Sequence, residues 1–414
     1  MSLNLLDTST NFIDFAVEKI GIIDLNWIGK IIQFLIEGVG IIGLGVILFT
    51  LILKTVMLPL DVYSRVKMKK QSLVMKKMRP QMEKLQKQYA NDKNMYSQKV
   101  MELQKANGIS MFGACLPMIV TLVVFMVVFG AFSTYSQYAS LSTYNDMVDS
   151  YNASVQAYVI EDGKDGFLQK KEDGALKEEA YLVKFDDFIR ISGTDEAKFN
   201  ALREADKMVI VRDYVRENAR KAAADYYRGH RNNFLWVGNV WYPDSLLNKE
   251  VPDFNKFSSS ISRAMGSGVD LTYEASYDEI THYLRNSGYE NESGKTEGGI
   301  FNGYFVLIVL AIGLMFLQQF ISMRAQKDAN ELGSVDGSAA RTNKWMLIMM
   351  PIIYGIFSFF YSAAFSLYMI TNTLYGLIMT VIVNKIMEVS FEKQEANGGY
   401  NAKRKQKNNR KRLK

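Results

Sequence analysis

Cysteine and histidine are scarce in this sequence, and their scarcity excludes several classes of protein. The 414 residues contain one cysteine, Cys115, and two histidines, His230 and His282. A single cysteine cannot form an internal disulfide, and this one lies in an apolar run, where a buried thiol is chemically inert. One thiol and two imidazoles are also too few for a Cys/His metal cluster. We therefore expect no metal and no other cofactor.

Catalytic and targeting motifs are missing as well. The sequence has no nucleophile elbow, glycine-rich phosphate loop or HExxH pair, so we do not expect an enzyme. Residues 1–23 lack a basic start, an apolar stretch and a small-residue cleavage site, so we expect no cleavable signal peptide. The basic segments lack interleaved aromatic residues and any nucleic-acid motif, which argues against a specific nucleic-acid sequence as a partner.

Long apolar runs are what the sequence has in abundance. The first is 41–60, IIGLGVILFTLILKTVMLPL. Because a helix rises about 1.5 Å per residue, this run spans roughly 30 Å, the thickness of a bilayer's hydrocarbon core. Further runs lie at 111–132, 300–323, 345–363 and 365–387. The sequence therefore predicts an all-α polytopic membrane protein with a five-helix transmembrane core.

The polar segments between these runs differ in charge, and the difference predicts the topology. Residues 61–110 hold twelve Lys and Arg against four Asp and Glu, and 324–344 and 388–414 are also net basic. Residues 1–40 and 137–299 have net charges of −3 and −8. Short cytosolic loops of membrane proteins are rich in Lys and Arg. We therefore expect five spans, with the N-terminus outside and the C-terminus in the cytosol.

Two segments near the first run have a helical pattern. Residues 25–39 alternate as an amphipathic helix that is too short to span, so 1–40 is expected to be an extracellular segment with an interfacial helix. A further spanning helix is the alternative. The basic segment 61–110 is expected to be a cytosolic helical hairpin that turns at 90–94, with a bend or break at Pro80.

The remaining polar segments are assigned from their composition. Residues 133–299 are tyrosine-rich and acidic, and we expect an extracellular insertion domain that is mainly α or α+β. Residues 324–344 are expected to be a cytosolic loop. Residues 388–414 are expected to be a basic cytosolic tail, with eight Lys and Arg and no acidic residue after Tyr400.

Lys54 is the one ionisable side chain inside the first apolar run. Translocon scales put a lysine at mid-helix at about 2.5–3.5 kcal/mol unfavourable, so it needs a structural or functional reason. Thr50, four residues before, and Asp61, seven residues after, share its helix face and form a thin polar stripe. Two interpretations stay open: Lys54 extends to the nearer headgroups, or it belongs to a polar site inside the membrane.

Several segments together resemble the YidC family of membrane protein insertases, which is related to the mitochondrial Oxa and chloroplast Albino proteins. The segments are LILKTVMLPL before a basic hairpin, ISMFGACLPMIV, NNFLWVGNVWYPDS and FSLYMITNTLYG. Their order and spacing carry the resemblance, which covers 24–135, 233–248 and 300–395. The long connection between the second and third spans departs from the family, because it holds two insertions, 137–232 and 249–299.

The resemblance implies a hydrophilic, client-binding groove inside the membrane. In the family, a positive residue of the first core span faces this groove, and Lys54 holds that position where arginine is usual. Lysine is a more compact and more strongly hydrated charge than arginine. The family's polar residue in the second span falls on Thr121, and its Ser/Thr-Asn pair in the fifth falls on Thr371 and Asn372. Thr50 is added to this set because it lies beside Lys54.

The resemblance also implies a function without catalysis: short polar segments of client proteins cross the membrane through the groove, and the clients' transmembrane helices are released into lipid. Nascent membrane proteins would be the partners, with the ribosome, the Sec translocon and anionic lipids as further candidates. The candidate residues for cytosolic recruitment are Arg65, Lys69, Lys70, Lys76, Lys77, Arg79, Lys403, Arg404, Lys405, Arg410, Lys411 and Arg412. Membrane topology alone would also explain these basic residues.

Two other function classes fit a polytopic membrane protein. A transporter or channel would need a pair of intramembrane ionisable groups, or broken helices in two corresponding halves. The sequence has no internal repeat, and the other charge within its apolar runs, Lys385, lies two residues from the end of the last run, which disfavours this class. An envelope scaffold would use the extracellular domain to bind a partner, and its Lys54 would be dispensable.

The charge asymmetry generates a test of the topology. Single cysteines placed at Ser110 or Ser334, in a variant without Cys115, should react only with reagent supplied from the cytosolic side. A cysteine at Ser192 should react only from outside. Labelling of position 334 from outside would contradict the five-span arrangement.

Overall fold

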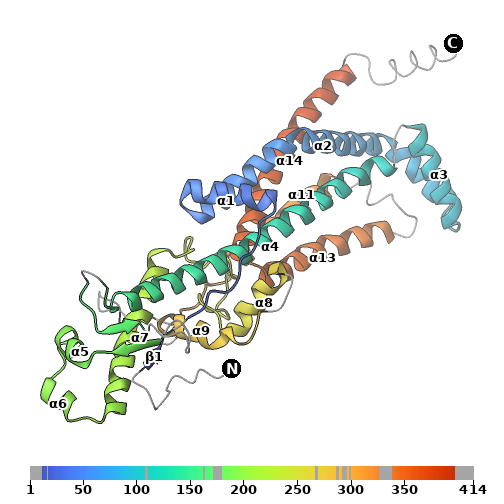
Figure 1. Cartoon of the computed structure of the whole chain (residues 1–414). Coiled ribbons are helices and arrows are strands. Elements are labelled where there is room, and N and C mark those ends of the chain that lie inside the picture. The colour runs from blue at the N-terminus through green and yellow to red at the C-terminus, as the bar shows by residue number, and fades with distance from the viewer. Residues whose placement is uncertain are drawn as a thin grey trace. The chain divides into compact units, whose positions relative to one another are not determined.

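The computed structural model describes residues 12–15, 17–107, 111–161, 164–170, 180–265, 269–285, 289–290, 296–297, 300–325 and 338–396. The chain divides into two compact units. The core unit comprises Ile31–Ala131 and Phe305–Lys414, and the insertion unit comprises Met1–Lys30 and Phe132–Tyr304. Helices dominate the chain and the strands are few and short (Figure 1), which confirms the predicted all-α membrane fold class.

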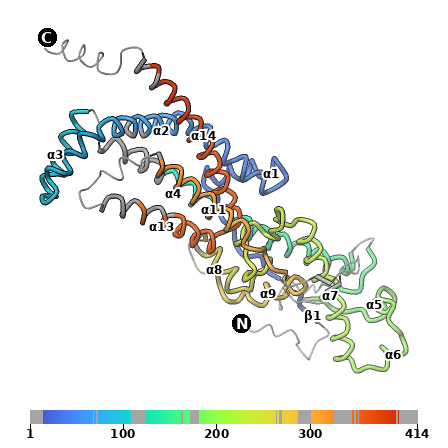
Figure 2. Tube along the Cα trace, turned by 180° about the vertical axis from the view of Figure 1, so that it is seen from behind, coloured from blue at the N-terminus to red at the C-terminus, as the bar shows by residue number. Residues whose placement is uncertain are grey.

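Long helices build the core unit. They are α1 (Trp27–Val39, whose first residues belong to the insertion unit), α2 (Ile42–Gln88), α3 (Lys93–Ala106), the first part of α4 (Met111–Gln156), α11 (Val306–Ala325), α13 (Ser338–Phe360) and α14 (Ala363–Ala396). The most extensive contact is that of α14 with α2, and α11 lies against both α13 and α14 (Figure 1, Figure 2).

Three helical segments among the described residues are long and apolar enough to cross a membrane: Ile42–Lys67, Val306–Arg324 and Ala363–Ser390. Large apolar side chains on them are exposed, including Leu51, Val56, Val309, Phe320, Ile378 and Ile382. Polar Thr50, Ser366 and Thr373 are buried on the same helices. Exposed apolar side chains beside buried hydroxyls are expected where lipid surrounds the helices and every backbone polar group is satisfied within them.

The second and fourth spans predicted from sequence are 111–132 and 345–363. The former lies on α4, and the latter lies on α13 up to Phe360, but each includes side chains outside the described residues. The five-span arrangement therefore stays a prediction.

The boundary predicted between the first span and the hairpin, at residues 60 and 61, falls inside one continuous helix. α2 has 47 residues and is about 70 Å long, roughly twice the thickness of the hydrocarbon core. Of the predicted bend or break at Pro80, the break is wrong, because α2 continues to Gln88. A proline inside a helix costs about 3 kcal/mol. Packing on both sides of Pro80 offsets this cost.

That packing joins α2 to α3. The buried residues of the cluster are Met75, Met78, Met82, Tyr96 and Val100. Burial of each large apolar side chain contributes about 1.5–3 kcal/mol. The turn before α3 is fixed by Asp92, whose carboxylate accepts hydrogen bonds from the backbone N–H groups of Asn94 (3.1 Å) and Met95 (2.9 Å). The basic segment thus folds into a helical hairpin with its own small core.

The insertion unit is mainly helical with two small antiparallel sheets. Its strands are β1 (Phe12–Asp14), β2 (Leu168–Lys170), β3 (Ala180–Val183), β4 (Tyr289–Glu290) and β5 (Thr296–Glu297). Its helices are the second part of α4, α5 (Phe185–Ser192), α6 (Glu196–Asn200), α7 (Glu204–Gly229), α8 (Phe254–Met265), α9 (Tyr273–Ile280) and α10 (His282–Arg285). The strand order is β1-β3-β2, with Phe12 opposite Leu182 and Leu168 opposite Val183. β4 pairs with β5.

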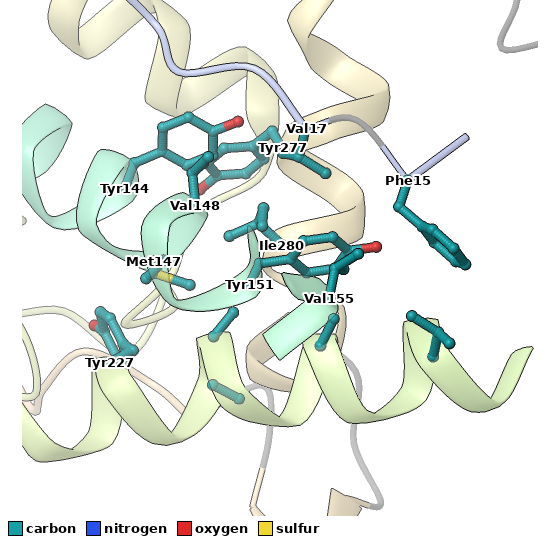
Figure 3. Close-up of a cluster of buried hydrophobic side chains, with 14 of the residues drawn as sticks. Phe15, Val17, Tyr144, Met147, Val148, Tyr151, Val155, Tyr227, Tyr277 and Ile280 are labelled. Carbon is teal, nitrogen blue, oxygen red and sulfur yellow. The ribbon is translucent and has the colours of Figure 1, made fainter. Parts of the chain in front are cut away.

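One hydrophobic core holds the insertion unit together. Along α4, the buried side chains at 144, 148, 151 and 155 repeat at helical spacing, and they meet Tyr277 and Ile280 of α9 (Figure 3). Residues 211, 215, 219 and 223 of α7 repeat every four residues and belong to the same core. Two of these are alanines, which allow close helix packing. The two insertions that sequence analysis separated, 137–232 and 249–299, therefore share a core.

A buried carboxylate connects three helices of this unit. Glu279 of α9 accepts hydrogen bonds from Arg216 (3.0 and 2.9 Å) and Arg220 (3.0 and 2.6 Å) of α7, and from the hydroxyl of Tyr151 of α4 (3.1 Å). Burial alone would raise the pKa of Glu279, but the two guanidinium groups outweigh it and lower the pKa below its ordinary value of 4.5. This charge is paired on both oxygens.

The Glu279 cluster generates a stability prediction. Glu279→Ala leaves two part-buried arginines without their carboxylate, which should destabilise the insertion unit by about 3–5 kcal/mol. Limited proteolysis of the full chain at rising temperature measures this. Glu217→Ala is the matched control, because Glu217 pairs with Lys221 on the exposed side of α7 and its loss should change little. If Glu279→Ala and Glu217→Ala resist proteolysis up to the same temperature, the prediction is contradicted.

The same cluster predicts a pH dependence. Because the folded-state pKa of Glu279 lies below the unfolded-state value of 4.5, its contribution to stability is complete above that pH and is lost as the pH falls through the folded-state pKa. The proteolysis midpoint of the natural protein should therefore fall on acidification below about pH 4.5, and less so for Glu279→Ala.

Candidate functional site

Three ionisable side chains lie along one face of α2 within its membrane segment. Lys54, Asp61 and Arg65 are spaced by seven and four residues, which brings them to the same side of a helix. The ammonium nitrogen of Lys54 lies 4.0 Å from a carboxylate oxygen of Asp61, and their side chains are 13% and 16% exposed. Arg65 is half-buried. Lys54 thus has an anionic neighbour inside the core unit. This neighbour, Asp61, lies further along α2, toward the hairpin.

α14 supplies the partners of this face. The hydroxyl of Tyr375 donates to the backbone carbonyl of Lys54 (3.5 Å), and the guanidinium of Arg65 donates to the hydroxyl of Thr380. One turn further along α2, Lys69 pairs with Glu388 at 2.7 Å.

These contacts also give the relative direction of the two helices. Residues 54, 65 and 69 of α2 contact residues 375, 380 and 388 of α14, in that order. The residue numbers therefore increase in the same direction along both helices. The two helices therefore run parallel to each other.

Gly376 allows a third helix to approach the same place. A Cβ atom at this position would lie 2.8 Å from the side-chain nitrogen of Gln318 on α11 and 3.4 Å from a guanidinium nitrogen of Arg65. The missing side chain leaves room for both groups beside α14. Cationic, anionic and amide groups from α2 and α11 therefore converge on the α14 segment around Tyr375 and Gly376.

Two polar atoms at this site are incompletely satisfied. Asp61 Oδ2 and Arg65 Nε are buried and have no hydrogen-bond partner within the described residues. A buried polar atom without a hydrogen bond costs about 1–3 kcal/mol. Both atoms can therefore gain from a polar group that enters the site: Oδ2 can accept a hydrogen bond, and Nε can donate one.

The other groove residues predicted from sequence differ in how they are placed. Thr50 is fully buried, and its hydroxyl donates to the carbonyl of Val46 at 2.7 Å. Thr371 and Asn372 are half-buried, one turn before Tyr375 and Gly376 on α14. The hydroxyl of Thr371 donates to the carbonyl of Leu367 at 2.9 Å. The side chain of Thr121, on α4, lies outside the described residues.

The predicted recruitment residues fall into three groups. Arg65 and Lys69 contact α14, so they belong to the interior of the core unit rather than to the free hairpin surface. Lys70, Lys76 and Lys77 are exposed on α2, and Arg79 pairs with Glu83 at 2.9 Å. The tail residues, Lys403, Arg404, Lys405, Arg410, Lys411 and Arg412, lie outside the described residues.

Sequence reasoning missed part of this site. It placed Asp61 at the end of a span and Arg65 in a cytosolic hairpin, because it ended the first helix with the apolar run. It did not single out Tyr375, Gln318 or Thr380. A signal was available in the spacing of 54, 61 and 65, which fits one face of a single continuous helix. Nothing in the sequence identified which face of α14 would meet it.

The residues also indicate what the site would bind. Among those that the structure describes, no group of three or more His, Cys, Asp and Glu side chains is arranged to hold a metal ion. The available groups are two cations, one carboxylate, hydroxyls and an amide. They suit reversible hydrogen bonding and charge pairing with a polar segment.

Comparison with known proteins gives one family model and several relatives that share one name. The model of a family described as 60Kd inner membrane protein matches residues 34–159 and 228–392, which is more than half of the chain. A membrane protein insertase YidC of Fusobacterium nucleatum is 38% identical over 92 residues, covering 22% of this chain and 43% of that protein. A protein of the same name from Caldanaerobacter subterraneus is 30% identical over 116 residues, covering 28% and 54%. The chain spans about half the length of these curated relatives. No solved structure gives a significant match.

Proposed function

Because this chain belongs to the 60Kd inner membrane protein family, which includes the YidC insertases, we propose that it is a membrane protein insertase. It moves short polar segments of client proteins across the bacterial cell membrane and releases their transmembrane helices into lipid. One observation carries the proposal: a line of charged and polar groups on α2, α11 and α14 lies within helices whose other faces are exposed and apolar. That combination suits a hydrophilic groove that lies beside lipid.

The physical problem for such a protein is desolvation. A polar client segment would have to leave water to cross about 30 Å of hydrocarbon, and each unsatisfied backbone group costs several kcal/mol there. Groups such as Lys54, Asp61, Arg65 and Asn372 replace part of the lost hydration and shorten the apolar stretch that the segment must cross. Thr371 adds a hydroxyl next to them, and Thr121 is proposed to line the groove from α4.

Release of the client's transmembrane helix into lipid needs no ATP. The client's own apolar helix leaves the groove for lipid, and burial of apolar surface contributes about 25 cal/mol per Å². Only the short polar part of the client depends on the groove.

The parallel direction of α2 and α14 supports the proposed topology. Two spanning helices that run in the same direction require an odd number of crossings between them, and the sequence offers three candidate runs there. With the basic segments in the cytosol, this gives five spans, an outer N-terminus and a cytosolic C-terminus. In this arrangement the insertion unit lies outside the cell and the hairpin lies inside.

Recruitment is proposed for the exposed cations of the hairpin. Lys70, Lys76 and Lys77 are exposed on the part of α2 beyond its membrane segment. They would attract the nascent chain, the ribosome or anionic lipid through long-range charge. Arg65 and Lys69 contribute less, because their side chains are engaged with α14.

A transporter is the second candidate, and the Lys54–Asp61 pair is the observation that favours it. Transporters use intramembrane ion pairs, but these commonly join corresponding halves of a repeated fold. Here Lys54 and Asp61 lie on one helix and the sequence has no internal repeat, which favours the insertase.

Lys54 provides the test of the proposal. Lys54→Arg keeps the positive charge and should retain activity, whereas Lys54→Leu removes it. A loss of about 1.4 kcal/mol of attraction in the rate-limiting step slows insertion roughly tenfold, and clients with acidic translocated tails should show this effect. Clients with neutral tails should suffer less, because hydroxyl and amide groups remain.

The measurement is insertion of matched clients that differ only in tail charge, at equal levels of each variant. If Lys54→Leu inserts every client at the natural rate, Lys54 is dispensable and the groove is not the working site. That outcome is expected if the protein is an envelope scaffold, in which Lys54 is dispensable.

A further inference from the structure

One face of the membrane segment of α2 holds two cations and one anion, Lys54, Arg65 and Asp61, and not an isolated cation. Asp61 lies 4.0 Å from Lys54 and four residues before Arg65, a spacing at which side chains are neighbours on a helix. If all three are ionised, their sum is one positive charge. Within this cluster Asp61 is the group that offsets the repulsion between the two cations.

Asp61 is held loosely compared with other carboxylates of this chain. Charge-assisted hydrogen bonds between nitrogen and a carboxylate are about 2.7–2.9 Å long, and the Lys69–Glu388 pair has that length at 2.7 Å. The Lys54–Asp61 separation is 4.0 Å, and Asp61 Oδ2 makes no hydrogen bond among the described residues. Asp61 is therefore attracted to Lys54 by charge without being fixed by a hydrogen bond.

The cations keep unused donor capacity. Arg65 Nε is buried and has no hydrogen-bond partner within the described part of the chain, although another nitrogen of the same guanidinium donates to Thr380. The bond to Thr380 fixes the guanidinium in position against α14. A guanidinium that is fixed and has an unused N–H is suited to bind a carboxylate.

We propose that Lys54 and Arg65 form a two-cation carboxylate site, that Asp61 is its resident anion, and that an acidic side chain of a client replaces Asp61 there. This inference rests on the proposed insertase function and adds the chemical class of the group that the site binds. No covalent step is involved, because one carboxylate is exchanged for another.

Exchange has two physical consequences. The cations stay compensated before and after the client arrives, so the helix avoids the cost of an unpaired charge in a low-dielectric environment. When Asp61 returns, it displaces the client carboxylate, which shortens the time that an acidic client spends in the site. Asp61 therefore sets how strongly the groove prefers acidic tails over neutral ones.

The test uses the full-length protein reconstituted in vesicles of one lipid composition, with matched clients whose translocated tails are acidic or neutral. The readout is the ratio of acidic-tail to neutral-tail insertion rates, which cancels differences in protein level. Asp61→Asn raises the net charge of the cluster by one, so this ratio should rise roughly fivefold, as expected for one added charge at moderate distance in a medium of intermediate dielectric. Glu102→Gln, which removes an exposed carboxylate on α3, is the matched control and should leave the ratio unchanged.

Two charge-balanced variants keep the test decisive if Asp61→Asn folds poorly. Asp61→Glu keeps the anion, so the ratio should stay at or below that of the natural protein. Lys54→Leu combined with Asp61→Asn restores a net charge of one through Arg65, so the ratio should recover from the low value of Lys54→Leu alone.

The outcomes separate this inference from the proposed function. If the natural protein inserts neither client, the insertase proposal fails. If it inserts both, but the ratio is the same for Asp61→Asn as for Glu102→Gln, or the double variant stays as low as Lys54→Leu, Asp61 is not the resident anion and the inference is overturned.

Discussion

The contact between α2 and α14 is the interaction on which the core unit depends. Both helices carry exposed apolar side chains on their outer faces, so hydrophobic burial against water cannot hold them together in lipid. Specific polar contacts and close packing must do so instead. The bonds of Tyr375 to Lys54, of Thr380 to Arg65 and of Glu388 to Lys69 set their register and direction. Gly376 supplies the close approach that brings α11 to the same place.

Glu279 of the insertion unit and Asp61 of the core unit are held in different ways. In the insertion unit, Glu279 accepts hydrogen bonds on both oxygens from two arginines and a tyrosine. That arrangement is typical of a structural ion cluster, which is costly to disturb because removal of one member leaves the others buried and unpaired. In the core unit, Asp61 and Arg65 each keep a buried atom without a hydrogen bond. Incomplete satisfaction is a cost to stability, and it is expected where a site must bind and release a polar group repeatedly.

The family match also shows which part of the architecture is shared. It omits 160–227, a stretch that includes β2, β3, α5, α6 and most of α7. Yet the buried side chains of α7 belong to the same hydrophobic core as those of α4, which the match includes. The omitted stretch is therefore integral to the insertion unit, because α7 contributes buried side chains to the core that it shares with α4. This chain thus combines a family core with a segment that completes a unit of its own.

The sequence by itself determined the features that depend on local pattern and on composition. The apolar runs predicted a helical membrane protein, the sequence around Pro59 and Thr371 indicated the family, and the position of Lys54 gave the centre of the candidate site. The cluster of turn-forming residues at 90–94 likewise predicted the turn between α2 and α3, because turn preferences are local. The reason is physical: helix formation in lipid follows from the length of an apolar run, which can be read along the chain.

Only the tertiary structure decided the features that depend on partners distant in sequence. Pro80 remains inside a helix because the packing of Met78 and Met82 against α3 offsets the local cost. Arg65 belongs to the membrane segment rather than to the hairpin surface because Thr380, 315 residues further along the chain, accepts its hydrogen bond. Two stretches of the insertion unit form one body because neither could bury its apolar face alone. In each case a long-range contact outweighed a local preference, and no local pattern records such contacts.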